Sequence, residues 1–187
     1  MWGQWKTKQP FFILRSLALF ATVVAIIEKA GGQMADYIKE IRALVGHKPI
    51  ILNAAAGAVF NDEGRILLQQ RTDNRTWSLP GGYMEYGETF RENVLREYKE
   101  DSGLAVRVDH FIGIFDQGFT VYPNGDECQV ISTLWAVTPI GGKRITEEQY
   151  ETVGTDYFTE DDLPPLLNQQ SADMIHAAFA DWRKTQG

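Results

Sequence analysis

The sequence has little cysteine and little positive charge. Cys128 is the one cysteine among its 187 residues, which excludes an intrachain disulfide and a cysteine-rich zinc site. Cys128 adjoins an apolar stretch, so we expect a buried thiol. Lysine and arginine total 18 against 25 aspartate and glutamate, a formal net charge of −7 at pH 7. A uniformly acidic surface argues against binding of a nucleic-acid backbone, and we expect no nucleic-acid partner.

Internal repeats, low-complexity tracts and signs of a second domain are also missing from the sequence. Hydrophobic residues make up 44% and charged residues 23%, so a sizeable core is possible. The length suits one domain of ordinary size with an extension.

Residues 1–33 differ from the rest of the chain. Lys6 and Lys8 precede an apolar run over residues 11–27, which is interrupted by Arg15. Positive residues followed by such a run are typical of a signal or anchor segment. The run is short for a membrane span, however, and no clear cleavage site follows it.

We expect instead that Met34 is the true start of the protein, because it opens an amphipathic helix. The four residues before it could be encoded by a purine-rich ribosome-binding sequence. On this hypothesis residues 34–187 form one domain, and the protein is cytoplasmic. The alternatives are a membrane anchor through residues 11–27, a cleaved signal and a soluble helix.

The most informative stretch runs from Gly82 to Leu104 and joins a glycine turn to an acidic helix. Glu97, Glu100 and Asp101 lie on one helix face, since about 3.6 residues make a turn. Like charges crowded there destabilise a helix unless a cation sits among them, and a hard divalent cation prefers oxygen ligands. An apolar stripe borders this face and should meet a core; it consists of Phe90, Val94 and Tyr98. The alternative is an ordinary solvated helix face.

The same stretch resembles the Nudix box, in which a glycine and a glutamate precede the pattern Arg-Glu-apolar-x-Glu-Glu-x-Gly-apolar. The matching positions are Gly82, Glu88 and residues 96–104. Two positions depart from the pattern. Tyr98 stands in place of an aliphatic residue, and Asp101 stands in place of a glutamate and is one methylene shorter.

The resemblance implies a metal-dependent hydrolase that cleaves the diphosphate linkage of a nucleoside diphosphate derivative, with Mg²⁺ or Mn²⁺ as cofactor. The expected metal ligands are Glu97, Glu100, Asp101 and the Gly81 carbonyl, with Glu100 as the leading one. The expected catalytic residues are Glu97, Glu100 and Arg96. Arg96 lies four residues from Glu92 and from Glu100, so it can hold carboxylates in place.

Other positions of the box are expected to shape the site. Gly82, Glu88 and Gly103 are the structural positions, with Glu88 bracing the turn into the helix. The base that activates water is a box glutamate or a carboxylate from a downstream loop, Glu151 or Glu148.

We expect the substrate to be a small nucleotide-type molecule. Arg71, Trp77, Tyr83 and Tyr122 are the candidate substrate-binding residues, through a phosphate for Arg71 and a base for the aromatics. The alternatives are a surface charge and core aromatics. A ligand-sensing Nudix domain without turnover is the alternative function, and a diphosphate isomerase fits poorly because Cys128 falls on an expected strand. The family also suggests a homodimer.

The order of elements predicts an α+β fold with helices on both faces of a mixed sheet, and the resemblance implies an α/β/α sandwich. Residues 50–60 and 65–71 should form a hairpin. The remaining elements are helices over 35–45, 89–101, 159–164 and 171–184, strands over 105–116, 129–137 and around 157–158, a loop over 117–127 and a turn over 139–143. We expect Gly46 to end the first helix and Ser171 to cap the last.

Overall fold

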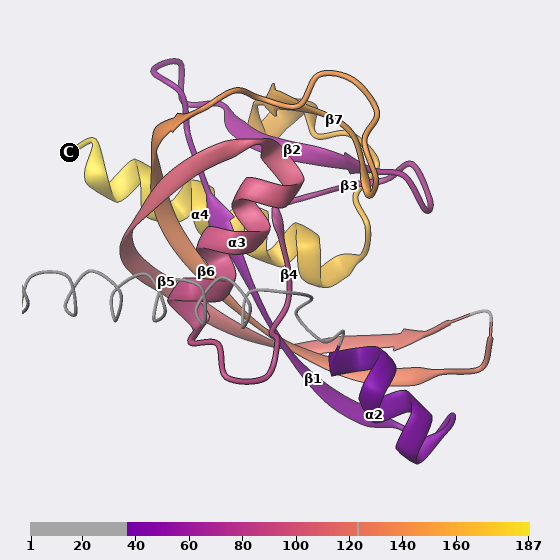
Figure 1. The fold of residues 1–187 in the computed structure, drawn as a ribbon. Coiled ribbons are helices and arrows are strands. Elements are labelled where there is room, and N and C mark those ends of the chain that lie inside the picture. Colours follow the sequence, from indigo (N-terminus) through magenta and orange to yellow (C-terminus); the bar gives the residue numbers. More distant parts are fainter. Residues whose placement is uncertain (1–36, 123) are drawn as a thin grey trace, which may run out of the picture. The chain divides into compact units, whose positions relative to one another are not determined.

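The described part of the chain forms two β-sheets in the computed structural model, which describes residues 37–122 and 124–187 (Figure 1). The expected extension, residues 1–33, lies outside it. The first sheet has the order β4-β1-β6-β5 and the second the order β3-β2-β7. The strands are β1 (Ile50–Ala58), β2 (Ile66–Arg71), β3 (Trp77–Ser78), β4 (Gly81–Tyr83), β5 (Leu104–Val121), β6 (Glu127–Gly142) and β7 (Thr152–Phe158). β1 runs parallel to β6, and the other named pairs are antiparallel.

Helices cover both faces of the first sheet. Successive residues of a strand point to opposite faces, so two neighbouring residues of β1 show what packs on each face. Ala55 packs in one buried cluster with Val94 and Tyr98 of α3 (Phe90–Ser102). Its neighbour Ala56 packs in another cluster with residues of α4 (Gln169–Thr185). The expected α/β/α sandwich is therefore confirmed.

Both ends of α3 are set by residues that lie next to them in the sequence. The Thr89 hydroxyl accepts from the Glu92 N–H, and the Glu92 carboxylate accepts from the Thr89 N–H, which makes a capping box. The helix ends at Gly103, whose φ of 77° is left-handed and favours glycine. A Cβ on Gly103 would lie 2.2 Å from the Lys143 carbonyl oxygen.

The predicted hairpin of residues 50–60 and 65–71 is wrong, because β1 and β2 belong to different sheets. Val59 accepts a hydrogen bond from Leu67, and Phe60 forms an isolated bridge with Ile66. The pairing stops there, since β1 takes β4 and β6 as its neighbours. Local turn signals describe the connection but not the partners of a strand.

β5 and β6 are longer than predicted. Residues 117–121 and 139–142, expected in a loop and a turn, pair in one antiparallel ladder. Pro139 is tolerated because it lies beside a register shift between Ala105 and Val106. The ladder supplies hydrogen bonds that outweigh the turn preference of glycine and proline.

The end of the chain also differs in detail from the prediction. The expected helix over 159–164 is a short 3₁₀ turn, η1 (Glu160–Asp162), and the Thr159 side chain makes no capping hydrogen bond. The last helix begins earlier than predicted, because its cap is Asn168 and not Ser171. The Asn168 side chain accepts a hydrogen bond from the Ser171 N–H.

A small projecting unit extends from the domain at the lower right of Figure 1. We call it the arm; it comprises α2 (Tyr37–Val45) and residues 50–54 of β1, 117–121 of β5 and 127–131 of β6. Tyr37 and Ile38 of α2 pack on a buried cluster that includes Cys128. The buried thiol is thus confirmed, and Gly46 ends α2 with a φ of 63°. Leu44, expected on the packed face, is 82% exposed.

Candidate active site

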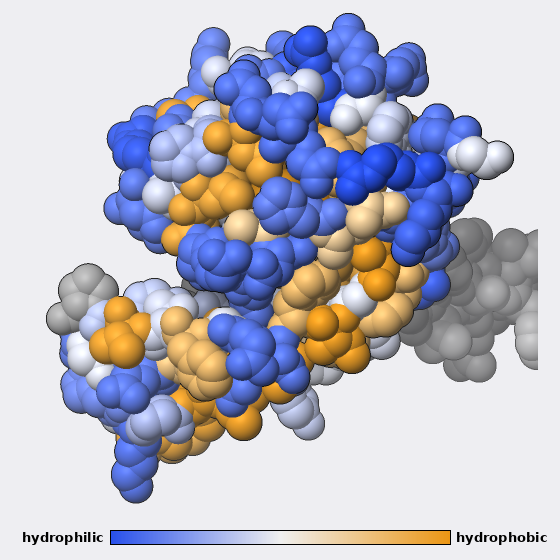
Figure 2. All heavy atoms as spheres, turned by 180° about the vertical axis from the view of Figure 1, so that it is seen from behind, coloured by the Kyte–Doolittle hydropathy of each residue, from blue (hydrophilic) through white to orange (hydrophobic). Residues whose placement is uncertain are grey.

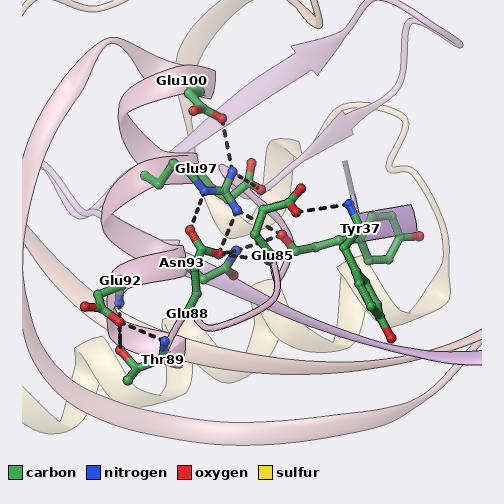
Figure 3. A network of polar contacts seen from close by, with 10 residues as sticks. Tyr37, Glu85, Glu88, Thr89, Glu92, Asn93, Glu97 and Glu100 are labelled. Carbon is green, nitrogen blue, oxygen red and sulfur yellow. Dashed lines mark hydrogen bonds and ion pairs between the residues drawn. The ribbon is translucent and has the colours of Figure 1, made fainter. Parts of the chain in front are cut away.

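Arg96 organises the polar side of α3, where Figure 3 shows Glu88, Glu97 and Glu100 joined in one polar network. Its Nε and Nη2 donate to the two carboxylate oxygens of Glu88 at 2.6 and 2.9 Å. Its Nη1 donates to Glu97 Oε1 at 2.7 Å and to Glu100 Oε2 at 3.2 Å. Nη2 also donates to the Tyr83 carbonyl. Arg96 therefore fixes two box carboxylates relative to the turn before the helix, as the sequence suggested, whereas Glu92 is occupied by the capping box instead.

Glu88 ties the turn to the helix. It accepts from the Glu85 N–H at 3.0 Å and from the Asn93 side chain at 3.3 Å, in addition to Arg96. Burial raises the pKa of the Glu88 carboxyl, but the hydrogen bonds from Arg96 and Glu85 outweigh it, and the pKa is lowered. Glu88 is thus a charged brace of the turn, in the structural position predicted for it.

Two glycines leave room for the carboxylates. A Cβ on Gly82 would lie 2.6 Å from the carboxyl carbon and both oxygens of Glu97. Gly81 pairs with Ala56 of β1, where a Cβ would lie 2.4 Å from the Ala55 carbonyl oxygen. The backbone of β4 therefore approaches α3 and β1 as closely as only glycine permits.

Glu97 and Asp101 are the two buried carboxylates of the helix. Burial raises the pKa of Glu97 to about 7; Arg96 opposes this shift, while Glu100 and Glu151 add to it. Burial raises the pKa of Asp101 to about 8, with the charges of Glu97 and Glu151 acting in the same direction. Two acids that repel each other in a dehydrated place are strongly stabilised by any cation bound between them.

The three acidic side chains differ in exposure. Asp101 is 5% exposed as a residue, whereas the Glu100 side chain is 57% exposed and held at its tip by Arg96. The sequence put Glu100 first among the expected ligands. The structure brings Glu97 and Asp101 deeper into the domain, and Glu100 lies at the outer rim.

The two downstream carboxylates, Glu148 and Glu151, lie in different surroundings. Glu148 pairs with Arg75, Oε2 to Nη1 at 2.9 Å, on an exposed loop. Glu151 lies close enough to Glu97 and Asp101 for its charge to raise the pKa of both. Its backbone carbonyl accepts from the Thr72 N–H at 2.9 Å, which attaches its turn to the end of β2. Of the two predicted bases, Glu151 is the one beside the acidic helix.

Arg71 adds a cation to the same place. Its guanidinium donates to both oxygens of Asp73, at 3.1 and 2.8 Å. Burial lowers the pKa of Arg71, but Asp73, Asp101 and Glu151 outweigh it, and the pKa is raised. Arg71 therefore stays charged beside the buried acids, where a phosphate could meet it.

The three aromatic candidates do not gather there. Trp77 packs edge-on against Phe158, with ring centroids 4.8 Å apart, in the cluster under α4. Tyr83 packs into the arm cluster, and its hydroxyl lies 2.9 Å from that of Tyr122. Trp77 is thus a core aromatic, while the tyrosine pair lies on the arm side of β4.

Sequence reasoning missed Gln69, which is 1% exposed on β2. Its Nε2 donates to Asp101 Oδ2 at 2.5 Å, and its Oε1 accepts from the Thr152 hydroxyl at 2.7 Å. The Gly81 N–H also donates to Asp101 Oδ2, at 2.9 Å. A glutamine that follows three apolar residues in a strand was the available signal. Gln69 joins α3 to β7 through one buried amide.

The side chains suit a cation that is only partly enclosed by protein. The described residues hold no preformed group of three or more His, Cys, Asp or Glu side chains that could bind a metal ion. Mg²⁺ usually keeps several waters and is bound by one or two carboxylates together with substrate phosphates. Glu97 and Asp101, buried and hard in their donor atoms, fit that pattern.

Comparison with known proteins agrees with this arrangement. A family model, described as the NUDIX domain, matches residues 51–178. The chain belongs to the Nudix family. It is a Nudix hydrolase, and enzymes of this family act on small nucleotide-type substrates and generally use divalent metal ions.

Several known proteins are similar to this Nudix hydrolase in sequence or structure. A MutT-like protein of Streptomyces ambofaciens is 33% identical over 115 residues, which cover 62% of this chain and 68% of that protein. An ADP-ribose pyrophosphatase of Methanocaldococcus jannaschii is 31% identical over 116 residues, which cover 60% of this chain and 64% of that protein. The crystal structure of an ADP-ribose pyrophosphatase from Streptococcus suis 89-1591 has a TM-score of 0.57 at 27% identity and covers 71% of this chain and 92% of that one.

The described residues, 37–122 and 124–187, contain no helix that is long and apolar enough to cross a membrane. The apolar run over 11–27 lies outside them.

Proposed function

We propose that this Nudix hydrolase cleaves the diphosphate linkage of a nucleoside diphosphate derivative by attack of water. One observation carries the proposal: Glu97 and Asp101 are buried within electrostatic reach of each other and of Glu151, with Arg71 beside them. This combination offers acidic oxygens for a cation, a base for water and a positive charge for a phosphate.

Glu97 and Asp101 would hold Mg²⁺ or Mn²⁺, with the Gly81 carbonyl as a further oxygen and Glu100 at the rim. Both donors to Asp101, Gln69 and the Gly81 N–H, reach Oδ2, so we assign Oδ1 to the cation. When bound, the cation neutralises phosphate oxygens and makes water more acidic.

The residues of the chain divide the remaining work. Arg71 binds a phosphate oxygen and orients the bridge. Glu151 accepts a proton from the attacking water, because it lies within electrostatic reach of Glu97 and Asp101. The hydrogen bond from the Thr72 N–H to its carbonyl holds its turn there. The water oxygen forms the new bond to phosphorus, the bridging P–O bond breaks, and the leaving phosphate carries the electron pair. Arg96 acts as a positioning residue that keeps Glu97 in place.

ADP-ribose is the first substrate to test within this class. The names of two relatives support it, since both the Methanocaldococcus jannaschii protein and the Streptococcus suis structure are ADP-ribose pyrophosphatases. Tyr122, on the arm side of β4, is the aromatic candidate for contact with the base, because 39% of its surface is exposed.

The test is turnover by the full chain with Mg²⁺ or Mn²⁺ against a panel of ADP-ribose, other nucleoside diphosphate derivatives and nucleoside triphosphates, with products resolved by chromatography. We expect two phosphate-containing products from a diphosphate derivative, and their loss in Glu97→Gln and Asp101→Asn. Glu148→Gln is the matched control, since Glu148 pairs with Arg75 on the exposed loop. Turnover that survives both helix variants would overturn the assignment.

A further inference from the structure

A link of three buried polar side chains runs from the acidic helix to the second sheet. It consists of Asp101 on α3, Gln69 on β2 and Thr152 at the start of β7. Figure 2 shows hydrophilic residues over much of one side of the domain, and the surface is where polar side chains are usually found. Burial of a polar group costs free energy unless the group is hydrogen-bonded, so the arrangement of these three side chains is specific.

The hydrogen bonds determine which way the Gln69 amide points. An ionised carboxylate only accepts, so the amide nitrogen faces Asp101, and Nε2 donates to Oδ2 at 2.5 Å. The amide oxygen then faces Thr152, whose hydroxyl donates to Oε1 at 2.7 Å. The reverse orientation would set an amide oxygen against a carboxylate. Thr152 therefore helps to keep Gln69 as a donor to Asp101.

Gln69 and Asp101 are matched in length. Asp101 is one methylene shorter than the glutamate of the box pattern. An asparagine at position 69 would withdraw the amide by up to about 1.5 Å, the length of one carbon–carbon bond, which is too far for a hydrogen bond. A glutamate at position 101 would push the carboxylate into an amide that already lies at 2.5 Å. The two side chains therefore fit each other as a pair.

The other end of the link reaches the turn that carries Glu151. Thr152 is the next residue of the chain, and it exchanges two backbone hydrogen bonds with Gln149 across this turn, both at 2.8 Å. The hydroxyl of Thr152 is held by Gln69. Because the turn is short and closed, the place of Thr152 determines where Glu151 leaves the backbone. Gln69 thus spans the distance between Asp101 and the turn of Glu151.

We propose that Gln69 is a positioning residue, which holds the Asp101 carboxylate and the turn of Glu151 at the separation that the reaction needs. The inference rests on the proposed function, in which Asp101 binds the cation and Glu151 accepts the proton. Gln69 acts through Asp101: together with the Gly81 N–H it occupies Oδ2 and leaves Oδ1 to the cation. The alternative is a residue that only stabilises the contact of the two sheets.

The test exchanges the lengths of the two side chains. Gln69→Asn and Asp101→Glu each break the match, whereas the double variant restores it with the extra methylene moved to the other residue. Binding of Mn²⁺ alone to the full chain is followed by the loss of the electron paramagnetic resonance signal of the free ion. Loss of a group that orients a metal ligand weakens binding on the order of 10-fold. We expect that loss in each single variant and recovery of most of the affinity in the double variant.

A matched control lies next to Gln69 in the chain. The amide of Gln70 donates to the Arg75 carbonyl at 2.9 Å in an exposed turn, so Gln70→Asn should leave the Mn²⁺ affinity unchanged. Steady-state kinetics with the diphosphate derivative that the wild type cleaves best is the second readout. In Gln69→Asn we expect kcat to fall with little change in KM, because Gln69 does not contact the substrate.

Thr152 supplies a second pair of variants, which decides the question if Gln69→Asn does not fold. Thr152→Val removes the hydroxyl at nearly unchanged shape, and Thr152→Ser keeps it. We expect weaker Mn²⁺ binding and lower kcat in the valine variant and nearly wild-type values in the serine variant. Thermal unfolding in chelator reports the stability of each. A lower melting temperature with unchanged Mn²⁺ affinity would show a purely structural link and overturn the proposal.

The outcomes separate this inference from the proposed function. Mn²⁺ binding that Glu97→Gln abolishes, but that Gln69→Asn and Thr152→Val leave unchanged, would overturn the positioning role alone. A double variant that binds Mn²⁺ no better than its parents would overturn the match in length. A wild type that neither binds Mn²⁺ nor cleaves any diphosphate derivative would overturn both the inference and the proposed function.

Discussion

Arg96 holds Glu97 with one guanidinium nitrogen, Nη1 to Oε1 at 2.7 Å, while its other two nitrogens grip Glu88. The side chains of Arg96 and Glu88 are 17% and 13% exposed, so their charges are largely dehydrated. The position of Glu97, which we propose as a metal ligand, therefore depends on an ion pair that begins in the turn before the helix.

Replacement of Arg96 tests that dependence. In Arg96→Lys the two-point grip on Glu88 is lost, because an ammonium is a single donor centre. Because lysine keeps the charge and loses hydrogen bonds to Glu88, we expect the free energy of unfolding to fall by about 2 kcal/mol and kcat to fall with it. Denaturant titration and steady-state kinetics are the measurements. Arg75→Lys is the control: its pair with Glu148 is more than half exposed on both sides, and such pairs contribute less than about 1 kcal/mol.

Gly82→Ala should separate catalysis from stability. The new methyl group would meet the movable carboxylate of Glu97 at 2.6 Å, so Glu97 must turn aside while the backbone stays. Small displacements of a reacting group cost on the order of 100-fold in rate. We expect a loss of that size in kcat with an almost unchanged melting temperature. Gly141→Ala, where a Cβ has nothing within 4 Å, should leave both unchanged; equal losses of kcat in the two variants would contradict the steric reason.

The stability of the metal-free protein should depend on pH through its buried acids. Burial raises the pKa of Glu97 to about 7 and of Asp101 to about 8, above the unfolded values of about 4. The folded state then holds protons that the unfolded state has lost, so stability falls as pH rises from about 4 to about 8. A bound cation prefers the ionised acids, so the stability it adds grows over the same range.

Denaturant titrations in chelator measure that slope. The readout is the difference between wild type and the double variant Glu97→Gln, Asp101→Asn, because the double variant keeps every other titrating group. We expect the wild type to lose stability relative to the variant as pH rises. A difference that is flat in pH would show that the two acids are not perturbed in the folded state.

The backbone conformation of Tyr150 should lower the free energy of unfolding. It is 100% exposed and holds a φ of 37°, in the left-handed region where a side chain is unfavourable. Tyr150→Gly should therefore raise the free energy of unfolding by about 1 kcal/mol. Tyr150→Ala keeps the strain and should change little. Thermal unfolding of both variants is the measurement, and an equal effect of alanine and glycine would contradict the backbone argument.

The sequence was most informative where chemistry depends on local spacing. The segment from Gly82 to Gly103 predicted its helix, its glycine turns and the role of Arg96, because each follows from positions within a few turns of one another. The hairpin of β1 and β2 was wrong, and Gln69 was missed, because both depend on partners far along the chain. Asp101 and Glu100 are adjacent in sequence, and which of them is buried is decided by β2 and β4.

The two sheets contribute different halves of the candidate site. Glu97 and Asp101 lie on the helix that covers the first sheet, whereas Gln69, Arg71 and the turn before Thr152 belong to the second. The site thus lies where the two sheets meet, and the Gln69 amide links them through its hydrogen bonds to Asp101 and Thr152. A transient separation of the sheets would dismantle it while each sheet kept its own ladder intact. Heat or denaturant should accordingly abolish activity before the protein unfolds globally. Secondary structure that remains under such conditions therefore does not indicate that activity remains.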